Sequence, residues 1–159
     1  MLSLQNDFTV RPLDVDDASN LSSLLLAQSP AYVRFFTPFD FQHPSIVRLL
    51  AGQGKDIFMG MYWDDRLAGF FMLRGWNEGY EIPSYGVLVD ERFSGYGLTR
   101  LSLKLAKSIC KLRRVPGIML KVNPDNKIAK RLFEEAAFVQ TGVDAQTGNL
   151  IYHFDINKR

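Results

Sequence analysis

The segment from Val89 to Thr99 holds the residues whose type and spacing most clearly suggest chemistry. It reads Val-Asp-Glu-Arg-Phe-Ser-Gly-Tyr-Gly-Leu-Thr and lies between a strand pattern and a helical pattern. Glycines let the backbone approach a ligand closely, and the free N–H groups of an opening helical turn attract phosphate. No Lys-Ser or Lys-Thr pair follows directly, so the segment is not the P-loop of a nucleotide-hydrolysing protein. Its glycine spacing also differs from the fingerprint of dinucleotide-binding proteins. A tight turn is the alternative explanation of Gly95 and Gly97.

The elements that must position this junction follow from the apolar periodicity of the chain. An amphipathic helix is predicted over residues 97–114, and a second helix over 126–137. Earlier helices are expected after the capping residue Asp14, within 32–41 and over 44–50. Strands are predicted over 8–11, 56–63, 66–74, 81–90, 118–122, 138–144 and 150–156. The order indicates one α/β (α+β) domain over residues 1–159, with a mixed sheet and helices packed on its faces.

The junction gains meaning from a second segment that follows one helix and one strand later. This segment reads Asn123-Pro124-Asp125-Asn126-Lys127-Ile128-Ala129-Lys130-Arg131-Leu132-Phe133-Glu134-Glu135-Ala136-Ala137-Phe138. Together the two resemble the GNAT family of acetyl-CoA-dependent N-acetyltransferases, which carry a Gln/Arg-x-x-Gly-x-Gly/Ala loop and a later Asn-x-x-Ala-x-x-Leu-Tyr-x-x-x-Gly-Phe helix. The specific part of the resemblance covers residues 87–138. It implies a mostly antiparallel sheet of six or seven strands, with helices on both faces and a splay between strands 4 and 5.

The resemblance also implies which residues hold acetyl-CoA. The loop fits the family pattern in two registers, one through Arg92, Gly95 and Gly97 and one through Ser94, Gly97 and Thr99, and helix length favours the second. Backbone N–H groups of this loop would bind the pyrophosphate, while the strand at 87–89 and Asn126 would bind the pantetheine arm. The expected coenzyme-binding residues are Val87, Leu88, Val89, Arg92, Ser94, Gly95, Tyr96, Gly97, Leu98, Thr99, Asn126 and Phe133.

Departures from the family pattern bear on proton transfer. The family's Tyr, which often protonates the departing thiolate, falls on Phe133, and the Gly before the final Phe falls on Ala137. Lys121 occupies the position of the glutamate base of ribosomal-protein acetyltransferases, which weakens the case for that activity. We therefore expect Glu81 to be the general base, with Glu78 as the alternative. Tyr152 or water is then the expected acid.

The acceptor pocket is expected in the aromatic segment 32–41 and in the segment 76–85. Tyr and Trp offer flat surfaces to a sugar or base ring, and Arg binds hydroxyls or phosphates. A core role for the phenylalanines is the alternative. The two segments also resemble acetyltransferases of surface-polysaccharide pathways, which act on nucleotide-linked amino sugars. The expected substrate-binding residues are Phe36, Arg74, Trp76, Tyr80 and Tyr85.

The composition argues against several other classes of protein function. Nineteen Lys and Arg against 17 Asp and Glu leave a net charge of only +2, which argues against nucleic-acid binding. The apolar runs are too short to span a bilayer, and no export signal is visible, so the cytoplasm is expected. One cysteine, Cys110, and two histidines make a disulfide or a Cys/His metal site implausible.

The sequence therefore predicts transfer of an acetyl group from acetyl-CoA to a small-molecule amine by direct attack, without a metal. A protein or peptide acetyltransferase and a non-catalytic acyl-CoA-binding module are the alternatives. A homodimer through the final strands, which is common in this fold, also stays open.

Overall fold

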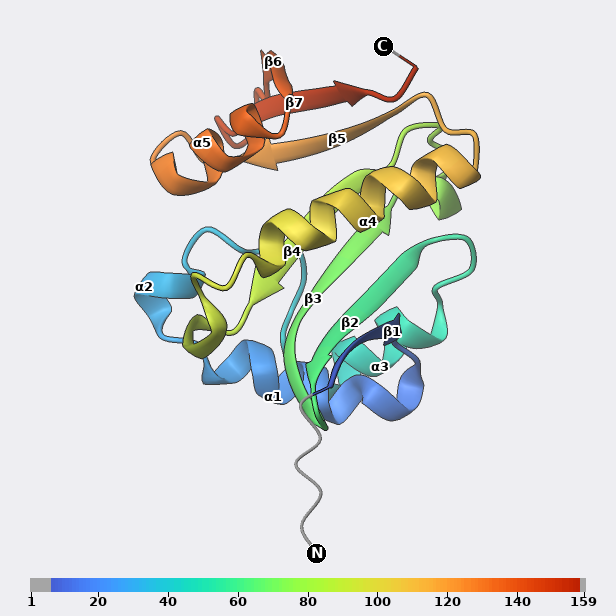
Figure 1. Ribbon diagram of the computed structural model, residues 1–159, viewed down its shortest axis with the longest axis vertical. Helices are drawn as coiled ribbons and strands as arrows, with labels where there is room; N and C mark the ends of the chain where they lie inside the picture. Colours follow the sequence, from blue (N-terminus) through green and yellow to red (C-terminus); the bar gives the residue numbers. More distant parts are fainter. Residues whose placement is uncertain (1–6, 158–159) are drawn as a thin grey trace, which may run out of the picture.

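The computed structural model describes residues 7–157, which contain one seven-stranded sheet with helices on both faces (Figure 1). The strand order is β1-β2-β3-β4-β5-β7-β6. The strands are β1 (Phe8–Pro12), β2 (Ile57–Trp63), β3 (Arg66–Arg74), β4 (Ser84–Val89), β5 (Gly117–Val122), β6 (Val139–Val143) and β7 (Leu150–Asp155). The helices are α1 (Ala18–Ala27), α2 (Pro30–Val33), α3 (His43–Ala51), α4 (Leu98–Leu112) and α5 (Lys127–Glu135), with 3₁₀ turns η1 (Val15–Asp17), η2 (Trp76–Glu78) and η3 (Glu91–Phe93). No helix in this range is long and apolar enough to cross a membrane.

Strands β4 and β5 form the one parallel pair of this sheet, and they separate almost at once. Ser84 lies opposite Met119, and no further Cα pair joins the two strands. The other neighbouring pairs are antiparallel. The predicted mixed sheet, its helices on both faces and its splay between strands 4 and 5 are therefore confirmed.

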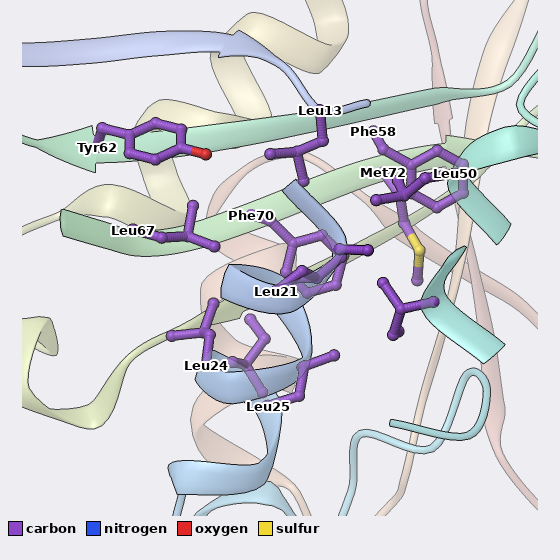
Figure 2. Packing of buried hydrophobic residues seen from close by; sticks show 13 residues of the cluster. Leu13, Leu21, Leu24, Leu25, Leu50, Phe58, Tyr62, Leu67, Phe70 and Met72 are labelled. Atoms are coloured by element: carbon purple, nitrogen blue, oxygen red, sulfur yellow. The ribbon is translucent and has the colours of Figure 1, made fainter. Parts of the chain in front are cut away.

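Alternating side chains of β3 feed two separate cores. Phe70 and Met72 point to the face covered by α1 and α3, where Leu21 and its neighbours meet them (Figure 2). Phe71 and Leu73 point to the face covered by α4 and α5. Because each buried Leu or Phe side chain stabilises the fold by about 1.5–3 kcal/mol, this alternation keeps the centre of the sheet fixed on both sides.

Most element boundaries differ from the predicted ones by one or two residues, and the short helix expected within 32–41 lies earlier, at Pro30–Val33. Two larger differences have local reasons. Asp14 caps the 3₁₀ turn η1, and α1 begins only at Ala18, because the side chains of Asp14 and Asp17 each accept a backbone N–H of this first turn. The strand predicted from residue 81 begins at Ser84, since Pro83 has no N–H to donate to a neighbouring strand.

Asp17 anchors the start of α1 to the sheet. Its carboxylate accepts two bonds from the Arg11 guanidinium, at 3.1 and 2.9 Å, and lies 3.3 Å from the Tyr62 hydroxyl. Asp17 is only 5% exposed. The hydrogen-bonded guanidinium holds the pKa of this carboxyl below its ordinary value.

We expect Asp17→Asn to lower the free energy of unfolding at pH 7 by about 2 kcal/mol, because it removes a charged acceptor from a buried network. Since the folded-state pKa is lowered, the contribution is complete above the unfolded-state pKa of about 3.9 and is lost as the pH falls through the folded-state pKa. Urea unfolding between pH 2.5 and 7 measures both effects.

Asp16→Asn is the matched control, because Asp16 is exposed in the same turn. Equal unfolding curves for the two variants would contradict the role of Asp17.

Candidate functional site

The separation of β4 from β5 opens a groove of about 620 Å³, here called the β4–β5 groove. Its walls come from both strands, from the first turn of α4 and from α5. They include the predicted residues Val87, Leu88, Val89, Thr99, Asn126 and Phe133. The structure thus brings together half of the twelve residues expected to bind the coenzyme, although these six are spread from Val87 to Phe133.

The β4 edge of this groove presents unpaired backbone groups. The N–H of Asp90 donates to Ala68 O at 2.8 Å, so the even-numbered residues of β4 pair with β3. The odd-numbered residues, Val87 and Val89, then turn their N–H and C=O groups toward β5. The Tyr32 hydroxyl binds Val89 O at 2.6 Å, a contact between residues 57 positions apart that no sequence pattern signals. Val87 is left free to pair with an extended amide-containing ligand.

The start of α4 supplies donors for an anion. Gly97 caps the helix with φ 79°, and Gly95 precedes it with φ 84°. Among the described residues, the N–H groups of residues 95–100 have no acceptor. A Cβ atom at either glycine would meet nothing within 4 Å, so the loop faces open space. Free amides at the positive end of a 15-residue helix can hold an anion such as phosphate.

The other predicted residues of this loop, at positions 92–98, lie outside the groove. Tyr96 is 76% exposed, and the Ser94 hydroxyl donates to Glu91 O at 2.8 Å. Arg92 is turned away from the groove and pairs with Asp90 at 2.8 Å, beside a hollow bounded by α1 and the β2–β3 turn. This ion pair lowers the pKa of Asp90. Thr99 in the groove and Arg92 outside it favour the register through Ser94, Gly97 and Thr99. Neither Leu98 nor its neighbours at 94–97 line the groove.

Asn126 and Phe133 place one polar and one apolar group in the groove. Asn126 Oδ1 accepts the N–H of Ala129 at 3.3 Å and caps α5, which leaves its side-chain NH₂ available. Phe133 is 7% exposed and meets Tyr85 edge-on at 6.1 Å. The observed cap at Asn126 is thus compatible with the ligand contact predicted for this residue.

A second hollow of about 580 Å³, here called the aromatic hollow, adjoins the groove. The two share Phe35, Phe36, Tyr85, Gly86 and Lys121, so they meet where β4 begins to leave β5. The predicted substrate residues Phe36, Arg74, Tyr80 and Tyr85 line the aromatic hollow. Trp76 does not line it, because its ring packs under the Arg113 guanidinium at 4.4 Å.

Of the predicted proton-transfer residues, Glu81 and Tyr152 lie outside both hollows. Glu81 is exposed in the bend before β4, whereas Glu78 lines the aromatic hollow. Tyr152 is fully buried, and its hydroxyl has no hydrogen-bond partner within the described part of the chain. Burial raises its pKa.

Tyr85 lines both hollows, and its hydroxyl is buried. It hydrogen-bonds with Ser102 Oγ, and Ser102 donates to Thr99 O at 2.8 Å. Burial raises the pKa of Tyr85, so this hydroxyl keeps its proton. The chain of bonds fixes Tyr85 against the first turn of α4. Among residues 7–157, no group of three or more His, Cys, Asp or Glu side chains could hold a metal ion.

Comparison with known proteins gives a consistent result. The model of the acetyltransferase (GNAT) family matches residues 23–138. Among curated proteins, no significant match was found. The fold is similar to that of PaiA N-acetyltransferase from Thermoplasma acidophilum, solved in complex with coenzyme A, with a TM-score of 0.79 and 13% identity over 94% of this chain and 99% of that one.

Two further solved structures have folds similar to that of this chain. Ribosomal-protein-S5-alanine acetyltransferase from Vibrio fischeri has a TM-score of 0.79 and 12% identity over 98% of this chain and 96% of its own. RimJ from Mycobacterium smegmatis, in complex with CoA-disulfide, has a TM-score of 0.75 and 17% identity over 93% of this chain and 81% of its own. At these identities the likeness establishes the fold.

We expect Gly97→Val to weaken binding of coenzyme A at least tenfold, because a branched side chain at φ 79° distorts the turn that presents the free amides. Gly148→Val is the matched control, since Gly148 has φ 75° and equally open surroundings in the β6–β7 turn. Both variants should lose about 1–2 kcal/mol of stability. Titration calorimetry with coenzyme A, beside thermal unfolding, separates the two effects, and equal affinities in the two variants would remove the anion site from the β4–α4 junction.

Proposed function

The chain belongs to the GNAT family of acetyl-CoA-dependent N-acetyltransferases, and we propose that its acceptor is the primary amine of a small molecule. One observation carries the proposal: the β4–β5 groove and the aromatic hollow meet at Tyr85 and Gly86, at the point where the two strands separate. A coenzyme in the groove and an amine in the hollow would meet there.

The groove and the adjoining start of α4 suit two chemical parts of coenzyme A, the pantetheine arm and the pyrophosphate. The free N–H groups of residues 95–100 suit the pyrophosphate, the backbone of Val87 suits the amides of the pantetheine arm, and the Asn126 side chain can bind the same arm. Phe133 supplies an apolar wall. Bound acetyl-CoA supplies the activated acetyl group, and the residues of this chain align that group with the amine.

The aromatic hollow suits a compact acceptor better than a peptide. Its charged lining residues are Arg74, Glu78 and Lys121, so the lining is not acidic, and Phe35, Phe36 and Tyr80 supply flat apolar surface. A nucleotide-linked amino sugar, with a ring and phosphates, is one acceptor that these groups fit.

Proton transfer is the least specialised part of this site. The attacking amine must be neutral, and at pH 7 deprotonation costs about 4–5 kcal/mol for a lysine-like amine but only about 1 kcal/mol for an α-amine. In the reaction the amine nitrogen bonds to the acetyl carbon, the C–S bond breaks, the amine gives up a proton and the thiolate takes one. With Tyr152 buried away from both hollows, we propose that water protonates the thiolate.

A glutamate at the aromatic hollow can accept the proton of the amine. Glu78 is placed to do so directly, and Glu81 would have to act through water. We expect Glu78→Gln to lower kcat about a hundredfold while the affinity for acetyl-CoA stays unchanged. Glu81→Gln is the matched control and should stay within about threefold of wild type. Steady-state kinetics of the two variants decide the base, and the reverse pattern would assign it to Glu81.

Protein acetylation is the second candidate function, favoured by the names of two similar structures. The Vibrio fischeri protein is a ribosomal-protein-S5-alanine acetyltransferase, and RimL is a ribosomal α-N-protein acetyltransferase. An N-terminal α-amine shares the low pKa that this site favours.

Titration calorimetry with acetyl-CoA, followed by a thiol-release assay, tests the proposal. The acceptors are amino sugars, amino acids, polyamines and a short peptide with a free α-amine. We expect micromolar binding of acetyl-CoA and turnover of a small amine. Turnover of the peptide alone would transfer the function to the second candidate, and binding without any turnover would indicate a non-catalytic acyl-CoA-binding module.

Two wider expectations go with this proposal. The free, buried Cys110 agrees with a reducing cytoplasm. A homodimer remains open, because β6 is an edge strand with Val139 64% and Val143 56% exposed.

A further inference from the structure

We propose that the acceptor is an amine that also carries an anionic group, a carboxylate or a phosphate, and that Arg74 binds this group. The inference rests on the proposed function and deepens it. It starts from the charges around the aromatic hollow, which are not equally available to a ligand.

Lys121 is already neutralised within the protein. Its ammonium group lies 2.8 Å from Asp144 Oδ2, and this hydrogen bond lowers the pKa of Asp144. Arg74, in contrast, has no ion pair and no hydrogen bond from its guanidinium within residues 7–157. Among the lining residues, Arg74 is therefore the cation left for a ligand.

The Arg74 guanidinium contacts an aromatic ring, and its hydrogen-bond donors stay free. Its central carbon lies 5.6 Å from the centre of the Phe39 ring, and the side chain is half-buried. Contact with an aromatic face uses no N–H group of the guanidinium. All five donors stay free, in the planar arrangement that matches a carboxylate or a phosphate.

The turn after Arg74 is fastened from outside the hollow. Asp56 Oδ1 accepts the N–H groups of Gly75 and Asn77, at 3.1 and 3.3 Å. Asn77 Oδ1 accepts the N–H of Lys55 at 2.8 Å. Gly75 has φ 120° and Gly79 has φ 90°, so the chain folds back and brings Arg74, Glu78 and Tyr80 to one hollow. The backbone next to Arg74 is thus fixed, so binding of an anion would require less ordering of the chain.

The position of Arg74 limits the size of the acceptor. Ser84 lies opposite Arg74 in the β3–β4 pair, and the next two residues, Tyr85 and Gly86, line both hollows. Neighbouring strands are only about 4.8 Å apart. An anion bound by Arg74 therefore lies close to the point where the amine meets the thioester, and both groups fit within one small molecule. The exposed carboxylate of Glu78 then complements the ammonium form of that molecule.

Matched acceptor pairs test this assignment. Glucosamine 6-phosphate is compared with glucosamine, and leucine with leucinamide, so that the two pairs separate phosphate from carboxylate recognition. We expect wild type to have a kcat/KM, calculated for the neutral form of the amine, at least about tenfold higher for the anionic member of one pair. Arg74→Gln should raise the KM of that member at least about tenfold and change kcat, and the KM of the neutral member, by less than about threefold.

Two controls keep a folding defect apart from a lost contact. Arg66→Gln removes an arginine outside both hollows and should leave both pairs unchanged. Arg74→Lys keeps the charge and should restore part of the anionic preference. Acetyl-CoA affinity and thermal unfolding should match wild type in all variants.

The inference is overturned if wild type turns over neutral and anionic members equally, or if Arg74→Gln weakens both members to the same extent. Either result leaves the proposed function intact. Absence of turnover with every amine would contradict the proposed function itself, and the inference would fail with it.

Discussion

The early separation of β4 from β5 is the constraint on which the site depends. A parallel pair of strands normally satisfies its backbone groups along its whole length, and an unpaired buried group costs about 1–3 kcal/mol. Here one register pair, Ser84 with Met119, joins the strands, and the freed edge of β4 at half-buried Val87 is open to water or to a ligand with amide groups. The fold thus presents an incomplete sheet, and coenzyme A has the chemistry that completes it.

The same separation makes the two hollows one continuous path, and the segment 28–36 ties both to the β4–α4 junction. Ser29 donates two hydrogen bonds to Glu91, at 2.9 and 3.2 Å, and Gln28 accepts the N–H of Glu91. Tyr32 binds Val89 O, while Phe36 lines both hollows. The acceptor side and the coenzyme side are mechanically connected through side chains that belong to neither motif.

Local patterns and long-range contacts explain which features the sequence could predict. The starts of α4 and α5 were predictable because Gly97 and Asn126 cap helices that begin at the next residue. The splay came from family resemblance, since nothing in residues 84–89 or 117–122 states that two strands diverge. The position of Arg92 was not predictable, because its partner Asp90 competes with any ligand. The packing of Trp76 outside the aromatic hollow was not predictable for a different reason. Its stacking partner, Arg113, is 37 positions away in the sequence.

The departures from the family pattern are each absorbed by the surrounding structure, and this bears on the chemistry. Phe133 packs edge-on against Tyr85 and Phe138 as part of the second core. Ala137 takes φ 71°, which costs about 1–2 kcal/mol for a residue with a Cβ, yet the turn is closed by the bond from Phe138 N to Phe133 O at 3.0 Å. Lys121 is bound to Asp144.

None of these three positions is left with a free group that could replace the lost acid or base. With Glu78 as the proposed base and water as the proposed acid, the site favours an acceptor whose amine is already partly neutral, and most of its rate would come from the position of the reactants. Fixed placement of two reactants can supply about 7–11 kcal/mol of the barrier, far more than the roughly 3–5 kcal/mol that one proton-transfer group contributes. The hydrogen bonds that fix the turn after β3 and the first turn of α4 are consistent with catalysis that rests on alignment.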